Sequence, residues 1–486
     1  MNKYKNVHFI GIGGTGLSAI ARVLLQSGYV VTGSDQMRSP NTQRLQTEGA
    51  KVFIGHDPEN ITGAELVIRS SAISDENIEV LTANLSGIKV LKRADFLGEL
   101  LVSRRVIAIA GSHGKTTTTA MVAWLLMSLG RDPSYIIGSE SKNLDENAHA
   151  GKGNDFVIEA DEYDYMFLGL SPHLAVVTNV EHDHPDCFPT KEDFEEAFLN
   201  FSKQILPNGF LLICGNDPGA LRLLSHANRE NLRTLTYGIV EEKNKKLLNK
   251  SSEQLDYFAQ HLIPNSVGGF SFDMCTNTGE ESHRVKIQIP GEHNALNTVA
   301  ALAVMDLLEI PISDAIEAMV EFRGTERRFE VLGQSLNITI VDDYAHHPTE
   351  IRSTLAAARV KYPERRIWAL WQPHTYSRTR TLLSDFSKAF NDADHIIVTD
   401  IYAARESSPP NGFSSHNVLA ALQKEISLPN QTVHYIPGKA KTRDFLLGEL
   451  KSGDLLIILS AGDANEIGCQ VMEALQNQNT ALIESR

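Results

Sequence analysis

Short β-branched or apolar runs alternate along this chain with amphipathic segments of about 10 to 15 residues. This alternation predicts βαβ units, in which helices cover a sheet of mostly parallel strands. The series restarts three times, with first strands expected at residues 7–10, 106–110 and 338–341. Helices are expected between strands, for example over residues 350–360 and 381–390. The pattern therefore indicates an α/β protein of three successive units.

Two breaks in this pattern divide the chain into three predicted domains. Arg104 and Arg105 mark the first junction, and the second falls near residues 322–324. The predicted domains cover residues 1–103, 104–322 and 323–486. From residue 228 to residue 281 the sequence turns polar and loses its periodicity, with a lysine-rich stretch at 243–250. We predict a β-ribbon or a loop insertion there.

The composition narrows the class of protein. The formal net charge of the 486 residues is −15, and a nucleic-acid partner is not expected because neutralising phosphates requires clustered Lys and Arg. The four cysteines lie far apart, without CxxC or Cys/His metal spacing, which favours reduced thiols. Residues 1–5 are polar, and no apolar run approaches the roughly 20 residues that cross a bilayer. We therefore expect a cytoplasmic protein with no membrane partner, and the sequence gives no indication of its oligomeric state.

A glycine-rich loop follows the first predicted strand. It reads GIGGTG over residues 11–16, and an apolar helix is expected after it. Glycines there let backbone N–H groups approach a pyrophosphate at a helix N-terminus. Asp35 ends the next strand, near the spacing of a ribose-binding carboxylate. The loop predicts a nucleotide-diphosphate site, and a tight glycine turn without a ligand is the alternative.

A second loop, residues 109–117, reads IAGSHGKTT and also lies between a predicted strand and a predicted helix. In such a loop Lys115 reaches the β- and γ-phosphates of a nucleoside triphosphate, and the Thr116 hydroxyl ligates Mg²⁺. The standard P-loop has a glycine five residues before its second glycine, where this chain has Ile109. The segment is therefore interpreted as a shortened P-loop, with a coincidental glycine turn as the alternative.

Polar residues follow the next two strands of the second unit. Four carboxylates come directly after the strand that begins at Phe156: Glu159, Asp161, Glu162 and Asp164. Carboxylates this close repel one another unless a cation lies among them, and Mg²⁺ prefers oxygen ligands. The following strand ends in TNVEHDHPD over residues 178–186, where His184 is a candidate metal ligand. A solvated acidic loop and a packed or surface histidine are the respective alternatives.

Eleven segments, in order along essentially the whole chain, resemble motifs of the Mur ligase family. They are GIGGTG from Gly11, SD at Ser34, GH at Gly55, SSAI from Ser70, GSHGKTTTT from Gly111, EADE from Glu159, TNVEHDH from Thr178, GEHNALN from Gly291, the pair Arg327 and Arg328, DDYAHHPTE from Asp342, and QPHTYSRTR from Gln372. Any one of these segments could arise by chance. Eleven in register make an accidental match remote.

The resemblance implies a Rossmann-like N-terminal domain that binds a UDP-sugar, a central P-loop domain that binds ATP and Mg²⁺, and a Rossmann-like C-terminal domain that binds an amino acid. Within the family the motifs are most similar to those of ligases that join L-alanine to UDP-N-acetylmuramate in peptidoglycan precursor synthesis. The implied reaction phosphorylates the lactyl carboxylate of the sugar and then displaces the phosphate with the amine. Phosphorylation is needed because a free carboxylate is a poor acylating agent at neutral pH. The remaining catalysis is positioning and charge stabilisation.

The resemblance also implies a role for individual residues. Those expected to bind the UDP-sugar are Gly11, Gly13, Gly14, Thr15, Gly16, Asp35, His56, Ser70 and Ser71. Those expected to bind ATP are Gly111, Ser112, His113, Gly114, Lys115, Thr116, Thr117, His293, Asn294, Asn297, Arg327 and Asp343. Thr116, Glu159 and His184 are expected to hold Mg²⁺, and Tyr344, His346 and Arg378 to bind the amino acid. Lys115, Arg327 and His346 are expected to act in catalysis.

Other interpretations exist for some of these residues. Asn294 also fits a helix N-terminal cap, and a surface arginine or a packed core histidine or tyrosine is the alternative for each amino-acid-binding residue. Thr375 stands where the alanine-adding ligases usually have an arginine, and Tyr163 and Ala345 replace a serine and a glycine that are common in the family. The last two replacements also occur in the murein peptide ligases, which attach a recycled tripeptide to the same sugar nucleotide.

Rival functions explain fewer of the motifs. A nucleotide-binding oxidoreductase accounts for GIGGTG and Asp35 but leaves the P-loop without a role. A regulatory P-loop ATPase leaves the segments from Asp342 and Gln372 unexplained. Groups expected on the middle and C-terminal domains must converge around the substrates, so the domains are expected to close when the substrates bind. We therefore also predict an open form of the unliganded protein.

Overall fold

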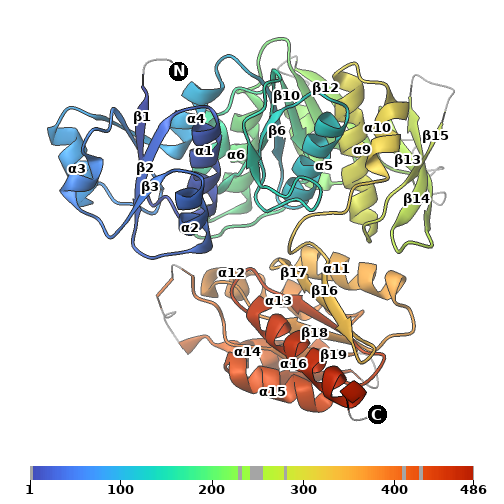
Figure 1. The fold of residues 1–486 in the computed structure, drawn as a ribbon. Coiled ribbons are helices and arrows are strands. Elements are labelled where there is room, and N and C mark those ends of the chain that lie inside the picture. The colour runs from blue at the N-terminus through green and yellow to red at the C-terminus, as the bar shows by residue number, and fades with distance from the viewer. Residues whose placement is uncertain are drawn as a thin grey trace.

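The computed structural model describes residues 4–227, 232–240, 255–277, 282–404, 406–407, 412–425 and 431–484. These residues form three sheets that follow one another along the chain, each covered by helices (Figure 1). The predicted α/β class with three units and mostly parallel sheets is confirmed. The exact boundaries at residues 103 and 322 stay predictions. No helix of the described part of the chain is long and apolar enough to span a membrane.

The first sheet is a five-stranded parallel sheet with the strand order β3-β2-β1-β4-β5. Its elements are β1 (Asn6–Ile10), α1 (Thr15–Gln26), β2 (Val30–Asp35), α2 (Pro40–Thr47), β3 (Lys51–Ile54), the 3-10 helix η1 (Pro58–Ile61), β4 (Leu66–Arg69), α3 (Ile78–Leu85), β5 (Lys89–Lys92) and α4 (Arg93–Leu101). The order reverses between β1 and β4, and open α/β sheets bind ligands at the carboxyl ends of strands beside such a switch. The GIGGTG loop directly follows β1.

The middle sheet has ten strands in the order β15-β14-β13-β12-β11-β10-β6-β9-β7-β8. The strands are β6 (Arg105–Ala110), β7 (Ser134–Ile136), β8 (Ala148–His149), β9 (Asp155–Glu159), β10 (Leu174–Val177), β11 (Phe210–Cys214), β12 (Arg233–Ile239), β13 (Tyr257–Pro264), β14 (Phe270–Thr276) and β15 (His283–Lys286). The helices are α5 (Lys115–Ser128), the 3-10 helix η2 (Tyr163–Gly169), α6 (Lys191–Ser202), α7 (Pro218–Ala227), α9 (Glu292–Leu307) and α10 (Ile312–Met319).

Strands β13, β14 and β15 pair antiparallel at one edge of the middle sheet. For the described residues, the β-ribbon expected between residues 228 and 281 is confirmed, and it extends the sheet through the parallel pairing of β12 with β13. The lysine-rich stretch 243–250 lies outside the described residues. This ribbon is remote from the strand ends that follow β6, β9 and β10.

The third sheet has six strands in the order β16-β17-β21-β18-β19-β20 and is parallel except at its β16 edge. Its elements are β16 (Glu330–Ser335), β17 (Ile338–Asp343), α11 (Pro348–Lys361), β18 (Ile367–Trp371), α12 (Tyr376–Thr381), α13 (Leu383–Ser387), β19 (His395–Val398), α14 (Ser415–Glu425), β20 (Thr432–Tyr435), α15 (Lys439–Glu449), β21 (Leu455–Leu459) and α16 (Asn465–Glu484). The expected single helix over residues 381–390 is wrong. Leu382 leaves helical geometry (φ −100°, ψ 17°), and two short helices, α12 and α13, flank it.

The three domains are joined in two different ways. Buried apolar side chains form one contiguous core through the N-terminal and middle domains. The C-terminal domain has separate cores on the two faces of its sheet, because successive strand residues such as Ile340 and Val341 point to opposite faces. Its described contacts with the middle domain include ion pairs and hydrogen bonds, such as that of Arg378 with Asp183. In Figure 1 this domain lies below the other two.

Candidate active site

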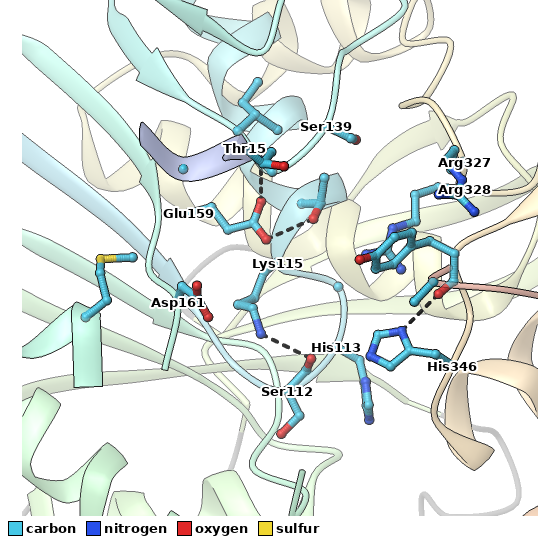
Figure 2. A pocket seen from close by; sticks show the side chains of 18 of the residues that line it. Thr15, Ser112, His113, Lys115, Ser139, Glu159, Asp161, Arg327, Arg328 and His346 are labelled. Carbon is cyan, nitrogen blue, oxygen red and sulfur yellow. Dashed lines mark hydrogen bonds between the residues drawn. The ribbon is translucent and has the colours of Figure 1, made fainter. Parts of the chain in front are cut away.

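A cavity of about 520 Å³ lies where the three domains meet, and each domain contributes to its wall (Figure 2). Thr15 and Gly16 come from the N-terminal domain, and Lys115 comes from the middle domain. The C-terminal domain contributes Arg328 and His346. Figure 2 shows Lys115 and Glu159 on one side and His346, Arg327 and Arg328 on the other. The structure thus brings residues from all four sets of predicted site residues, for the UDP-sugar, ATP, Mg²⁺ and the amino acid, to one cavity.

The P-loop connects the carboxyl end of β6 to α5. Gly114 has φ 79°, and a Cβ atom there would lie 2.7 Å from the Asn297 side-chain oxygen, so only glycine fits. The loop backbone is fixed from the next strand end. The backbone N–H of His113 donates to Asn179 Oδ1 (2.8 Å), and the Thr178 hydroxyl donates to the His113 carbonyl (2.6 Å). Strand β10 therefore sets the shape of this loop.

Lys115 is held by the P-loop itself and by a neighbouring carboxylate. Its Nζ lies 2.8 and 3.0 Å from the two Glu162 oxygens and donates to the carbonyls of Gly111 (2.5 Å) and Ser112 (3.2 Å). Burial opposes the charge of Lys115, but the carboxylates of Glu162 and Asp161 outweigh it and raise its pKa. The ammonium is thus a buried cation that already has an anionic partner.

Thr116 and Glu159, two of the predicted Mg²⁺ ligands, lie side by side. The Thr116 hydroxyl donates to Glu159 Oε1 at 2.9 Å, and the backbone N–H of Gly138 donates to Oε2 at 2.7 Å. This hydroxyl and carboxylate fit Mg²⁺, which prefers oxygen ligands. His184 lines the same cavity, with its Nε2 3.6 Å from Glu162 Oε1. The ligand set of Thr116, Glu159 and His184 stays a prediction.

Another group has its possible ligand atoms close together. In the described part of the chain, the metal-ligand side chains that lie as a trio within 4.8 Å of one another are His113, Glu181 and His347. The carboxylates of Glu181 and Glu350 raise the pKa of His113 to about 10, although burial alone would lower it. A proton on His113 accounts for this cluster without a metal ion.

A second cavity of about 250 Å³ lies on the other side of the P-loop. His293, Asn294 and Asn297 line it from the start of α9, and Thr117 and Asp343 also face it. The alternative of Asn294 as the helix N-cap is wrong, because Gly291 is the N-cap residue of α9 and Asn294 lies within its first turn, where its side chain donates to the Pro290 carbonyl (2.7 Å). His293, Asn294, Asn297 and Asp343, all predicted to bind ATP, are therefore gathered beside the P-loop.

Two titratable groups of the second cavity are perturbed by burial. Burial lowers the pKa of His293 to about 4, so this imidazole is neutral at pH 7. Burial raises the pKa of Asp343 to about 6. The two Asp343 oxygens accept backbone N–H groups of Phe329 and Ala345, each at 2.8 Å. Asp343 thus shapes the C-terminal wall of the second cavity.

The glycine-rich loop of the N-terminal domain is arranged by Asp35. Its Oδ2 accepts the backbone N–H of Gly13 at 2.8 Å, and Gly14 is the N-cap residue of α1. Gly11 has φ 81° and packs against Ser70, whose Cβ would lie 3.2 Å from an added Cβ. Gly16 lies directly against Arg93. The loop residues, Asp35 and Ser70 are therefore brought together at the end of β1.

His56 and Ser71, which are also predicted to bind the UDP-sugar, lie apart from the glycine-rich loop. His56 Nδ1 lies 3.1 Å from the Ser34 hydroxyl and 3.4 Å from the buried carboxylate of Glu79. Ser71 is exposed in the turn that follows β4. Neither residue lines the three-domain cavity. Their predicted contact with a UDP-sugar stays a prediction.

The predicted amino-acid residues lie on the C-terminal side of the cavity. Tyr344, His346 and Arg378 all line it. His346 Nδ1 donates to the Tyr344 carbonyl at 2.9 Å, which leaves the Nε2 lone pair free. Burial lowers the pKa of His346 to about 3. The neutral imidazole is therefore a hydrogen-bond acceptor within the cavity.

The two neighbouring arginines have different surroundings. Arg327 is held within its own domain, with Nε 2.9 Å from Asp342 and Nη2 donating to the Ser460 carbonyl (2.6 Å). Arg328, which the motif reading left without a role, lines both cavities and lies 3.6 Å from Glu350. Both lie on the wall of the larger cavity.

Four more charged residues complete the site and were missed as individual functional residues: Glu162, Asp183, Arg328 and Glu350. All four stand inside motifs that the sequence displays, namely EADE, EHDH, the arginine pair and HHPTE. The ionic partner of each residue comes from another segment of the chain. The sequence pattern therefore gave no signal for which residue of each motif would form an ion pair.

Three family profiles match the chain in order. The profile described as Mur ligase family, catalytic domain, matches residues 6–105, the Mur ligase middle domain matches 109–305, and the profile described as Mur ligase, glutamate ligase domain, matches 327–462. These matches cover most of the chain and all three sheets.

Similar proteins cover nearly the full length. A UDP-N-acetylmuramate–L-alanine ligase of Roseiflexus sp. (strain RS-1) is 38% identical over 97% of this chain and 99% of that protein. One of Syntrophotalea carbinolica is 40% identical over 98% of this chain and 99% of that protein. A solved UDP-N-acetylmuramate-alanine ligase of Thermotoga maritima is 26% identical, with a TM-score of 0.78 over 97% of this chain and 99% of that one. The chain belongs to the Mur ligase family.

Proposed function

We propose that this protein is an ATP-dependent ligase that joins L-alanine to the lactyl carboxylate of UDP-N-acetylmuramate. The observation that carries the proposal is the single cavity into which the GIGGTG loop, the P-loop and the polar residues of the C-terminal domain all open. A carboxylate, a phosphate donor and an amine must meet in one enclosed space for this reaction. The similarity to alanine-adding ligases over nearly the whole chain supports the same function.

The two cavities suggest where the nucleotide binds. The adenosine of ATP occupies the cavity lined by His293, Asn294 and Asn297, and its phosphates follow the P-loop toward the larger cavity. Backbone N–H groups at the start of α5 face the phosphates, and the helix dipole favours their negative charge. Lys115 then exchanges part of its contact with Glu162 for phosphate oxygens.

Thr116 and Glu159 are the residues that would hold Mg²⁺, together with His184. When bound, Mg²⁺ neutralises charge on the β- and γ-phosphates during transfer. Glu159 is kept in place by the N–H of Gly138, and Thr116 is fixed in the first turn of α5. The protein therefore supplies two oxygen ligands whose positions are set by a strand end and a helix start.

The sugar carboxylate lies near Thr15 and Gly16 and attacks the γ-phosphate, which forms an acyl phosphate and ADP. The amine of L-alanine then attacks the carbonyl carbon, the C–N bond forms, and inorganic phosphate leaves. Arg328 and Lys115 face the cavity and stabilise the transferred negative charge. His346 Nε2 accepts a hydrogen bond from the amine and orients its lone pair.

The amino-acid carboxylate requires a cation on the C-terminal side. Arg378 is directed into the cavity wall with Nε on Asp183 and Nη1 beside His374 Nδ1 (2.9 Å). The residue at 375 is a threonine, and of the two arginines that follow it in this segment Arg378 lines the cavity whereas Arg380 is exposed and does not. Its planar fork matches a carboxylate.

Phosphate release tests the proposal directly. The purified protein with ATP, Mg²⁺ and UDP-N-acetylmuramate should release phosphate continuously with L-alanine and much more slowly with other amino acids. A higher rate with the tripeptide L-alanyl-γ-D-glutamyl-meso-diaminopimelate would assign the recycling reaction instead. ATP consumption that is independent of the sugar nucleotide contradicts both.

A further inference from the structure

Glu350 connects two parts of the site that belong to different domains. It is the third residue of α11 and closes a capping box with His347. Its Oε2 accepts the backbone N–H groups of His346 (3.0 Å) and His347 (3.3 Å). Its Oε1 lies 3.2 Å from Nδ1 of His113, which belongs to the P-loop of the middle domain. One carboxylate therefore contacts the phosphate loop and the segment that carries His346.

His113 is a charged group between two carboxylates. Its Nε2 lies 3.0 Å from Glu181 Oε2, within the middle domain, while its Nδ1 faces Glu350. The Thr349 hydroxyl donates to Glu181 Oε1 at 2.8 Å, which adds a second contact between the same domains. Both His113 and Glu350 are largely buried, with side-chain exposures of 12% and 11%. Their interaction is therefore poorly screened by solvent.

The backbone of the P-loop does not depend on the His113 side chain. Thr178 and Asn179 hold the His113 backbone from β10. The imidazole is therefore not needed to hold the loop backbone, and its Nδ1 faces Glu350 in the first turn of α11. A capping carboxylate needs only one oxygen for the helix, so the second oxygen of Glu350 is available for His113.

We propose that Glu350 and His113 are positioning residues that couple the phosphate loop to the amino-acid-binding segment 344–347. Through this contact the C-terminal domain places His346 relative to the P-loop. The inference rests on the proposed function, because it assigns the phosphate to one side of the contact and the amine to the other. Arg328, 3.6 Å from Glu350 Oε1, lies beside the same contact and faces both cavities.

The two nitrogens of His113 can be tested separately. In His113→Asn the amide nitrogen takes the place of Nδ1 and keeps a donor toward Glu350. In His113→Gln it takes the place of Nε2 and keeps only the donor toward Glu181. We expect both variants to lower kcat, Gln about 10- to 100-fold, as a small misplacement of reacting groups does, and Asn by a smaller factor because it keeps the donor toward Glu350. The KM for ATP should change less than about threefold in both.

Glu350→Gln should lower kcat as His113→Gln does, and the double variant should be no slower than the slower single variant, because both remove one interaction. Asp193→Asn is the matched control. Asp193 is the third residue of α6 and closes a capping box with Thr190, away from both cavities. This control should keep full activity, which separates loss of a helix cap from loss of the contact with His113.

Hydrogen exchange gives a readout that does not require turnover. In His113→Gln the backbone amides of residues 344–347 and of Thr349 should exchange faster than in the unsubstituted protein, although the substitution lies in another domain. Equal kcat values for Asn and Gln, additive effects in the double variant, or unchanged exchange would each overturn the proposal. If the unsubstituted protein makes no amide product, the proposed function fails, and the exchange experiment still decides whether the two segments are coupled.

Discussion

Asp183 and Arg378 form a buried ion pair that joins the middle domain to the C-terminal domain. Asp183 Oδ1 lies 2.7 Å from Arg378 Nε, and each side chain is only 4% exposed. The guanidinium holds the pKa of Asp183 well below its usual range despite burial. Because the described apolar cores of the two domains are separate, polar contacts such as this pair join the two domains beside the cavity, and the open unliganded form stays a prediction.

Replacing Asp183 with Asn should therefore destabilise the contact between the middle and C-terminal domains. The change leaves a buried guanidinium without its anion, which costs about 3–5 kcal/mol. Small-angle scattering of the unliganded variant should show a larger radius of gyration. Asp444→Asn, which breaks an exposed pair with Arg443, is the control and should change stability by less than about 1 kcal/mol. An unchanged radius of gyration would contradict the role of this pair.

Lys115→Met should abolish most of the ligase activity. It removes the cation that faces the transferred phosphate, a loss on the order of 10²–10³-fold in kcat. Binding of the UDP-sugar to the N-terminal domain should persist, because the GIGGTG loop is arranged by Asp35 and not by Lys115. Calorimetric titration with the sugar nucleotide checks this. Comparable kcat values for the variant and the unsubstituted protein would argue against the P-loop assignment.

Glu159→Gln should raise the Mg²⁺ concentration that gives half-maximal activity. The amide keeps one oxygen for the Gly138 N–H but lacks the charge that attracts the cation. The measurement is a Mg²⁺ titration of phosphate release at fixed ATP. Asp164→Asn, another acid of the same segment, serves as a control, because Asp164 does not line the larger cavity. Equal Mg²⁺ requirements for both variants would remove Glu159 from the metal site.

Stability should fall as the pH is lowered below 6.5. Burial lowers the pKa of His346 to about 3 and the pKa values of His347 and His374 to about 4. Between pH 6.5 and 4 the unfolded chain binds protons at these histidines and the folded protein does not. The free energy of unfolding therefore decreases with falling pH, by up to about 1.4 kcal/mol per pH unit for each histidine.

Urea unfolding at pH 7, 6 and 5 measures this slope, and His374→Gln should reduce it. The raised pKa of His113 does not offset the effect, because its stabilisation is complete below pH 6.5 and is lost only as the pH rises through about 10. Asp343, whose pKa burial raises to about 6, opposes the effect between pH 6 and 4 because the folded protein binds this proton more tightly, but the three histidines outweigh this one carboxyl. Stability that stays constant from pH 7 to pH 5 would show that these imidazoles are already protonated in the folded protein.

The local parts of this protein could be predicted from its sequence. Alternating apolar runs indicated three α/β units, and two glycine-rich loops after strands indicated two anion sites, because these features depend on neighbouring residues. The break at Leu382 was not predictable in the same way, since the run from Thr381 to Phe390 is compatible with one helix and tertiary contacts decide otherwise.

Contacts between domains were beyond the sequence pattern. Arg378 was expected to meet a substrate, yet in this structure it is bound to Asp183, which lies 195 residues earlier in the chain. In the sequence Glu350 is one residue of the DDYAHHPTE segment, with no indication of its partner. The structure shows that it contacts His113 of the middle domain. Such pairings are set by how the domains pack, and a single sequence carries no periodic signal for them.

The pairing of Lys115 with Glu162 supplies the ammonium of the P-loop with a counter-ion from within the protein. A loop that exposed an unpaired ammonium would attract stray inorganic phosphate and other small anions from the surrounding solution. With the cation already engaged, weak single anions gain little by entering, whereas a polyphosphate chelated to a metal ion makes enough contacts to displace the carboxylate. The ion pair therefore predicts a loop that discriminates against simple anions before any substrate arrives.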